Sequence, residues 1–330
     1  MKLLVKNAIL MLLLTYAFSL NAQVKDATLV IGEFKISKVT DGDTFRFEGL
    51  DKSTRLLGID TEETFKSADA QQKTSEISRD WPKFYYEEKG KHDFPVKTDT
   101  PMGYDAWIWA KDYVEDFDHV RLELENKDRV IDVYGRYLVY IILIRKDGTE
   151  VNYNIECVKQ GYSPYFNKYG NSERFHQEFI DAQDYAIKNK LGIWSDKTMH
   201  YPDYPQRLEW WNKRAQQILD YNAKHKGDPK YFDMNEENDY NRLADNVGKE
   251  VIIFSSVGLI KKDKYPNLIP LSFNDKKVIN LVIFENKKEL LEKTNMNLLR
   301  EYYIYAKGKL QLYKDKYEIV LYNKDQVWIE

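Results

Sequence analysis

The sequence predicts an α+β protein, mainly β, in which a small barrel of about five strands packs against helices and a second, smaller β-barrel follows. Three observations predict this class. Short strand patterns recur from residue 27 onward, apolar residues return at helical spacing in two later segments, and a new series of strand patterns begins after residue 250. With 330 residues, the chain is long enough for two domains.

The first residues have the three parts of a secretory signal. Lys2 and Lys6 flank an apolar run at residues 8–14, which continues to Leu20 and Ala22. This run is too short to span a membrane, although a buried N-terminal helix is an alternative. We therefore expect an exported protein, periplasmic or secreted, with no membrane span once the signal is removed.

Composition limits the kind of partner and the source of stability. The formal charge is −3 at pH 7, and the mature chain, without the two signal lysines, carries −5. Any surface that binds nucleic acid must therefore be local. Cys157 is the only cysteine, which excludes an intrachain disulfide, and its apolar neighbours Ile155 and Val158 indicate a buried, inert thiol.

Residues 39–64 place acidic side chains at both ends of a predicted β-hairpin. Asp41 and Asp43 lie in a tight turn before the first strand, and the second strand runs into Asp60 and Glu63. In an antiparallel hairpin, the start of the first strand lies beside the end of the second. We expect these carboxylates to converge as a hard-cation site, for which calcium is the natural ligand.

Two arginines become candidate site residues because of this acidic cluster. Arg55 lies inside the second apolar strand and needs acidic or anionic partners there. Arg136 follows Tyr134 and Gly135 in a turn between strands, which in isolation predicts only a solvated side chain. Guanidinium groups beside a metal site suit the binding of phosphate oxygens.

Residues 65–102 are polar and contain three prolines, Pro82, Pro95 and Pro101. This composition predicts a long loop inserted into the domain, and such loops are usually functional or mobile. Its lysines and aromatic residues could touch a polyanion, or the segment is a solvated excursion, and both interpretations stay open. The elements expected after it are a helix at 106–117, a strand at 120–124, a strand pair at 128–144 broken at 134–136, a short helix at 151–160, and a helix at 175–191 with Ser172 as its N-cap.

Several short motifs occur in a characteristic order. They are DGDT, RLLGIDTEET, DVYGR, VKQG, a loop that bears tyrosines, and a helix ending in KLGIWS. Together they resemble the thermonuclease, or staphylococcal nuclease-like, family over roughly residues 27–195. The resemblance implies a five-stranded OB barrel with three helices, and a calcium-dependent nuclease that cleaves the 5′ P–O bond of DNA and RNA to leave 3′-phosphate ends.

The resemblance also implies roles for individual residues. It places metal ligands at Asp43, Asp60 and the Thr61 carbonyl, a glutamate that acts on the attacking water at Glu63, phosphate-clamping arginines at Arg55 and Arg136, and substrate-contacting tyrosines at Tyr134 and Tyr169. The substrate is expected to be single-stranded or locally open.

Four features depart from the family pattern. Glu62 replaces a usual proline and would add negative charge near the metal, Val133 replaces a usual lysine, and Asn167 stands at a usual tyrosine position. The excursion at 65–102 is longer than usual. These departures concern the substrate range, because every implied catalytic group is present.

The C-terminal third predicts a helix at 203–226, an acidic linker at 227–240, and then three strands, a helix and two strands. That order resembles the OB-fold domains that bind nucleic acid. Lysines and two aromatic residues could bind a phosphate backbone and stack bases, or could form a solvated surface: Lys261, Lys262, Lys264, Lys276, Lys277, Lys287, Lys288, Tyr265 and Phe273. The expected division is a signal peptide (1–22), a nuclease-like domain (23–200) with the 65–102 insertion, a helix and linker (201–240), and an OB-like domain (241–330).

The leading hypothesis is an exported calcium-dependent endonuclease that acts on DNA and RNA. One alternative is a catalytically inactive nuclease-like and OB scaffold that binds nucleic acid. Another is an adhesion or glycan-binding protein with a structural calcium, which leaves Arg55 and Arg136 without a role.

Overall fold

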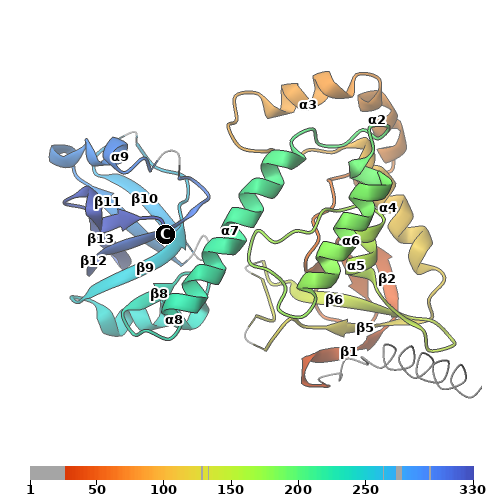
Figure 1. Cartoon of the computed structure of the whole chain (residues 1–330), viewed down its shortest axis with the longest axis horizontal. Helices are drawn as coiled ribbons and strands as arrows, with labels where there is room; N and C mark the ends of the chain where they lie inside the picture. The colour runs from red at the N-terminus through yellow and green to blue at the C-terminus, as the bar shows by residue number, and fades with distance from the viewer. Residues whose placement is uncertain (1–26, 128, 133, 263, 273–276, 297–298) are drawn as a thin grey trace, which may run out of the picture.

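The structure is a computed structural model that describes residues 27–330, except 128, 133, 263, 273–276 and 297–298. The expected signal at 1–22 lies outside the described residues, as do Val133, Phe273 and Lys276. Two bodies built on β-sheets lie on either side of one long helix, α7 (Tyr204–His225), which was predicted at 203–226 (Figure 1). None of the described helices combines the length and apolar character that crossing a membrane requires.

The first body has a mixed sheet in the order β1-β5-β6-β4, with β7 paired to β6, and a separate pair of strands, β2 and β3. The strands are β1 (Val30–Phe34), β2 (Ile36–Val39), β3 (Phe45–Phe47), β4 (Thr54–Leu56), β5 (His119–Glu123), β6 (Tyr137–Ile144) and β7 (Glu150–Asn152). The α+β class is confirmed. The predicted closed barrel is not found, because the pairings among the described strands leave the sheet open between β3 and β4.

The predicted hairpin between the two strands of residues 39–64 is wrong in its pairing. β3 pairs antiparallel with β2, whereas β4 pairs parallel with β6. The two strands still meet, since the Leu56 amide donates to the Asp43 carbonyl at 3.4 Å and the Thr54 hydroxyl donates to the Phe45 carbonyl at 3.1 Å. The apolar run of β6 is buried on both faces and takes β4 as an edge neighbour, a long-range preference that hairpin reasoning does not include.

Helices α4 (Pro101–Val114), α5 (Tyr153–Lys159) and α6 (His176–Asn189) complete the core of this body. α6 buries Phe179 and Ala182, and α5 buries Tyr153 and Cys157, so the inert buried thiol is as expected. The prediction that Ser172 is the N-cap of this helix is wrong, because α6 begins at His176. The Ser172 hydroxyl instead accepts a hydrogen bond from the Phe175 amide, at 2.9 Å, in the turn before the helix.

The inserted segment is not the predicted loop, because it folds into α2 (Ala70–Ser78) and α3 (Trp81–Lys89). Only Ala70 and Thr74 of α2 are buried, so the sequence lacks a clear apolar period there. α3 begins after Asp80, whose side chain accepts from the Lys83 amide, and has proline in its first turn. A small satellite core holds α3 against the end of the first domain; its buried members are Trp81, Tyr85, Met102, Ile193, Tyr201 and Tyr204.

The predicted acidic linker at 227–240 also contains structure. β8 (Tyr231–Asp233) pairs parallel with β9 (Glu250–Ser256), and α8 (Glu237–Arg242) follows it. Phe232 and Asp233 are buried. Only three residues form this strand, which is too short for alternation to stand out among acidic neighbours.

The second body is a sheet in the order β10-β11-β13-β12-β9-β8, with β14 paired to β12. Its further elements are β10 (Asn267–Ser272), β11 (Val278–Ile283), α9 (Leu290–Lys293), β12 (Tyr303–Tyr313), β13 (Lys316–Val320) and β14 (Val327–Trp328). An isolated bridge between Val257 and Leu271 joins the chain after β9 to β10. The predicted sequence of three strands, a helix and two strands is therefore observed, while the OB-like assignment stays a prediction.

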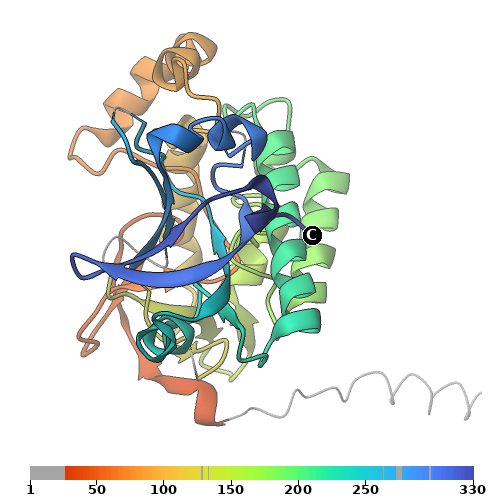
Figure 2. The same cartoon turned by 90° about the vertical axis from the view of Figure 1, so that its left-hand side faces the viewer.

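Helix α7 connects the two bodies through polar and aromatic contacts. The buried guanidinium of Arg214 donates to the carbonyls of Lys168, at 3.0 Å, and Glu301. Gln217 donates to the Tyr303 carbonyl at 2.8 Å. Figure 2 looks onto the second body and shows the long hairpin of β12 and β13 projecting from it. α7 therefore determines how the second body sits against the first.

The burial of Asp233 leads us to expect that the stability of the second body depends on pH. Burial, reinforced by Glu236 and Asp239, raises the pKa of Asp233 from 3.8 to about 7. The folded state therefore binds a proton that the unfolded state has released, so this residue's contribution to the free energy of unfolding falls as pH rises from about 4 to about 7. Asp233→Asn should remove that slope and stabilise the protein at pH 8 by on the order of 2 kcal/mol, with little change at pH 4.

Urea unfolding at several pH values measures this effect. Asp245→Asn, at an exposed position near the end of α8, is the matched control and should leave the slope unchanged. Equal pH profiles for wild type and Asp233→Asn would contradict the assignment.

Candidate functional site

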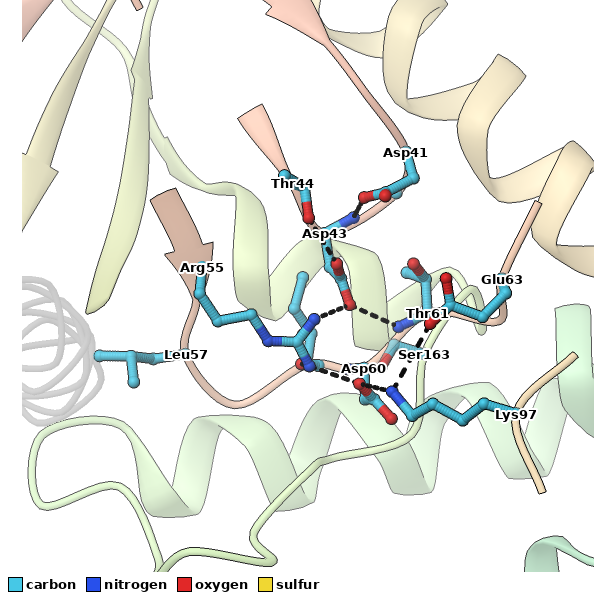
Figure 3. Close-up of polar contacts among 12 residues, drawn as sticks. Asp41, Asp43, Thr44, Arg55, Leu57, Asp60, Thr61, Glu63, Lys97 and Ser163 are labelled. Carbon is cyan, nitrogen blue, oxygen red and sulfur yellow. Dashed lines mark hydrogen bonds and ion pairs between the residues drawn. The ribbon is translucent and has the colours of Figure 1, made fainter. Parts of the chain in front are cut away.

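The acidic residues of the predicted site converge on one guanidinium group. Nη1 of Arg55 lies 2.5 Å from Oδ2 of Asp43, and Nη2 donates to Oδ1 of Asp60 (Figure 3). The Thr61 amide donates to the same Asp43 oxygen at 3.1 Å. Both aspartates are buried, so the predicted pair of carboxylates exists, and Arg55 lies between them.

The surroundings shift the pKa values of Asp43 and Asp60 in opposite directions. Burial, together with repulsion from Asp41 and Asp60, raises the pKa of Asp43 despite the attraction of Arg55. Burial also opposes ionisation of Asp60, but Lys97 and Arg55 outweigh it, and the pKa of Asp60 is lowered. Burial lowers the pKa of Arg55, while the two aspartates raise it by more. A buried like-charged pair needs such cations to remain ionised.

Two lysines from the inserted segment also reach the acidic cluster. Nζ of Lys97 lies 2.7 Å from Oδ1 of Asp60 and 3.8 Å from Oε1 of Glu63 (Figure 3). Nζ of Lys66 lies 2.8 Å from Oδ2 of Asp41. The insertion therefore supplies ammonium groups to the site.

The backbone around the acidic residues is held from two other elements. The Ser163 hydroxyl accepts from the Asp60 amide at 2.8 Å, and the Tyr153 hydroxyl of α5 donates to the Gly42 carbonyl at 2.8 Å. On the other side, the Thr100 amide donates to the Glu63 carbonyl at 3.0 Å. These bonds position Asp43, Asp60 and Glu63 relative to one another.

Glu62 does not add charge beside the two aspartates, contrary to expectation. Its buried carboxylate turns to the segment before α7, where Oε1 accepts from the Tyr201 amide at 2.7 Å and from the Tyr204 hydroxyl at 2.8 Å. Burial raises the pKa of Glu62 to about 7. Glu62 is thus an anchor between the acidic loop and the start of α7.

Arg136 is not in contact with the acidic cluster among the described residues. Its Nε and Nη2 lie 2.7 and 2.6 Å from Oδ2 of Asp132, and its Cζ lies 5.4 Å from the centre of the Tyr134 ring. The parallel pairing of β4 with β6 sets Arg55 opposite Leu138. Because side chains alternate along a strand, Arg136 falls on the same face of the sheet as Leu138 and Arg55.

The two predicted substrate tyrosines are accessible. Tyr134 is 79% exposed, and Tyr169 is also exposed in the loop after α5. In that loop Phe166 lies between the Arg55 guanidinium, 5.8 Å from its ring centre, and Trp211 of α7, with a centroid separation of 4.8 Å. Asn167, where the family has tyrosine, is buried and donates to the Asn212 side chain of α7 at 2.9 Å.

The donor chemistry fits a calcium ion, although the arrangement is not a complete metal site. Asp43, Asp60 and the Thr61 carbonyl offer only oxygen ligands, as a hard cation requires. Within the described part of the chain, no three His, Cys, Asp or Glu side chains form a group that could hold a metal ion. The cations that the acidic residues contact are those of Arg55 and Lys97.

Sequence reasoning missed three residues here, Lys66, Lys97 and Ser163. The lysines lie in a segment predicted to be a loop, and Ser163 lies more than one hundred residues from its partner Asp60. The one sequence feature that could have indicated these lysines is the acidic cluster, because buried carboxylates need cations nearby. That feature does not show which lysine lies next to the carboxylates.

Residues 53–196 match the family described as staphylococcal nuclease homologue. The chain is 28% identical over 190 residues to the thermonuclease of Staphylococcus intermedius, covering 57% of this chain and 91% of the relative. It is 29% identical over 168 residues to the thermonuclease of Staphylococcus hyicus, covering 49% of this chain and 76% of the relative.

The staphylococcal nuclease match places most of the acidic site in a known family. Arg55, Asp60, Thr61, Glu63 and Arg136 all fall within it, and these similarities support a nuclease-like function. The match ends before α7, so the second body lies beyond it.

A substitution at Gly103 of α4 tests how strongly activity depends on the position of Glu63. A Cβ at Gly103 would lie 1.9 Å from the Glu63 carbonyl oxygen, so the helix or the loop must move. Gly103→Ala should destabilise the fold by about 1–3 kcal/mol. It should also lower kcat by at least about tenfold, since a displacement of about 1 Å can cost a hundredfold.

Nuclease kinetics and thermal unfolding together measure this prediction. Asp105→Ala, at an exposed position of the same helix, is the control and should preserve both values. Activity of Gly103→Ala within twofold of wild type would show that the position of Glu63 is not critical.

Proposed function

We propose that this chain is an exported, calcium-dependent endonuclease that hydrolyses DNA and RNA. One observation carries the proposal: the fork of Arg55 spans the buried carboxylates of Asp43 and Asp60, beside the more exposed carboxylate of Glu63. A phosphodiesterase needs this combination of oxygen ligands, a phosphate-binding guanidinium and an accessible carboxylate. Export is proposed from the charged, apolar and small-residue pattern of residues 1–22.

Asp43, Asp60 and the Thr61 carbonyl would hold the calcium ion. Calcium would stabilise the charge that builds on the phosphate and favour ionisation of a water molecule. The side chain of Glu63 is 39% exposed, the most accessible of the clustered carboxylates, and would orient the attacking water or accept its proton. Calcium is a proposal from the oxygen donor set.

Arg55 and Arg136 would bind the non-bridging phosphate oxygens from neighbouring strands. Water attacks phosphorus, the bond to the 5′ oxygen breaks, and the 3′ side keeps the phosphate. Arg136 is held by Asp132, so its fork is oriented before substrate arrives. Loss of either arginine should cost roughly 3 kcal/mol of transition-state stabilisation, as loss of an oxyanion donor does. Tyr134 and Tyr169 would contact the bases or sugars of a locally open strand.

A catalytically inactive scaffold that binds nucleic acid is the second candidate. The observation that favours it is the internal neutralisation of the acidic residues, in which Arg55, Lys66 and Lys97 already contact Asp41, Asp43 and Asp60. In such a scaffold the lysines would replace the metal permanently.

Digestion of single-stranded DNA and RNA, with calcium and with a calcium chelator, separates these candidates. The enzyme should cleave only with calcium. Glu63→Gln should keep calcium affinity within about an order of magnitude while kcat falls by at least about a hundredfold, because the amide cannot accept the proton. Equal loss of calcium affinity and activity would make Glu63 a ligand instead, and absence of cleavage by wild type would favour the scaffold.

Lys97 provides a second test of calcium at this site. If calcium binds Asp60, it must compete with the ammonium group 2.7 Å away. Lys97→Met should therefore bind calcium about two- to fivefold more tightly, the effect expected when a partly exposed ion pair is removed. Isothermal titration calorimetry measures this directly.

Lys91→Met, at an exposed position in the same insertion, is the matched control and should not change the affinity. Unchanged calcium affinity in Lys97→Met together with a raised KM would identify Lys97 as a substrate contact rather than a competitor of the metal.

A further inference from the structure

Three exposed aromatic residues lie at one end of the second sheet. β11 and β13 are parallel, with Val282 opposite Val320, so the chain leaves both strands at the same end. Phe284 and Tyr322 each follow two residues later. The position of Tyr265 follows from the pairing of β10 with β11.

β10 is antiparallel to β11, with Asn267 opposite Ile283, so the residues that precede β10 lie at the same end. Tyr265 is two residues before Asn267, and an isolated bridge between Lys261 and Leu268 holds its loop against β10. One aromatic residue therefore lies at this end of each of the three neighbouring strands β10, β11 and β13. We call Tyr265, Phe284 and Tyr322, with the lysines around them, the aromatic end of the second sheet.

These rings are open to solvent, and two of them, Phe284 and Tyr322, border a hollow. Tyr265, Phe284 and Tyr322 are 42%, 48% and 62% exposed. A surface hollow of about 620 Å³ has Phe284, Lys287, Val320 and Tyr322 in its wall. Exposed aromatic residues gathered around a hollow usually mark a binding surface.

The surrounding charge favours an anionic ligand. The lysines are Lys261, Lys262, Lys264, Lys287, Lys288 and Lys324, and the described acidic residues are Glu285, Glu289 and Asp325. Within the described residues, none of these lysines forms a salt bridge, so their charge faces solvent. This contrasts with the acidic balance of the whole chain, which carries −3.

Aromatic faces beside unpaired lysines fit a single strand of nucleic acid. Bases stack on exposed rings whatever their sequence, and ammonium groups follow the phosphate backbone. We infer that the aromatic end of the second sheet binds single-stranded nucleic acid, separately from the acidic site of the first body. The inference rests on the proposed function for the identity of the polymer, and it gives the second body the role of holding the strand during cleavage.

The test is fluorescence anisotropy of a labelled single-stranded oligodeoxythymidylate of about 12 nucleotides with the full chain in a calcium chelator. The double variant Phe284→Ala/Tyr322→Ala should bind at least about tenfold more weakly, since each stacked base contributes about 1–3 kcal/mol. Lys264→Gln/Lys287→Gln should reduce the slope of log affinity against log salt by about 1.4, the value for two phosphate contacts on a single strand.

Tyr313→Ala is the matched control. Tyr313 is 57% exposed at the turn of the β12–β13 hairpin, past the other end of β13, and its loss should leave affinity unchanged. Thermal unfolding checks that each variant folds, which the exposure of the substituted rings favours. Wild-type affinity in the Phe284→Ala/Tyr322→Ala variant would overturn the inference.

Two further readouts make the outcome specific. If sedimentation shows a wild-type dimer that the double variant dissociates, the surface joins two copies of the chain and the inference fails. Cleavage of a dinucleotide, too short to span both sites, should be equal in wild type and the double variant. Loss of oligonucleotide binding in a chain that cleaves nothing would keep this inference and reject the proposed nuclease.

Discussion

The structure of the first body depends on burying Asp43 and Asp60 side by side. Two adjacent carboxylates in a region of low water content repel each other and lose hydration, so neither stays charged without a nearby cation. Arg55 supplies that cation from β4, and the Leu56 amide of the same strand donates to the Asp43 carbonyl. In the proposed function, a calcium ion and the phosphate of a substrate would bind to this same charged cluster.

The inserted segment and α7 meet this site from opposite sides. Lys66 and Lys97 bring further positive charge to the acidic residues, while Glu62 ties the acidic loop to the segment that starts α7. α7 then reaches the loop after α5 through Trp211 and Phe166, whose ring faces Arg55. The insertion lies within the matched residues 53–196 and α7 lies beyond them, and both shape the surroundings of Arg55 and Asp60.

The local patterns explain which predictions succeeded. The acidic residues were expected to converge, and they do, because charge and turn residues are local properties of residues 39–64. The pairing of the strands was wrong, since β4 prefers the buried run of β6, about eighty residues later in the chain. Polar helices such as α2 bury too few side chains to show a period, so the insertion was taken for a loop. Glu62 was expected beside a metal, but its direction depends on Tyr201 and Tyr204.

The sequence alone determined the α+β class, the helix α7, the order of elements in the second body, and the acidic residues and Arg55 of the site. These follow from apolar periodicity, turn residues and side-chain chemistry, all of which act over a few residues. Only the tertiary structure decided that Arg55 bridges both aspartates, that Lys97 reaches Asp60, and that three aromatic residues share one end of a sheet. Those contacts join segments that are distant in sequence, and their geometry is set by strand register and by the packing of the whole chain.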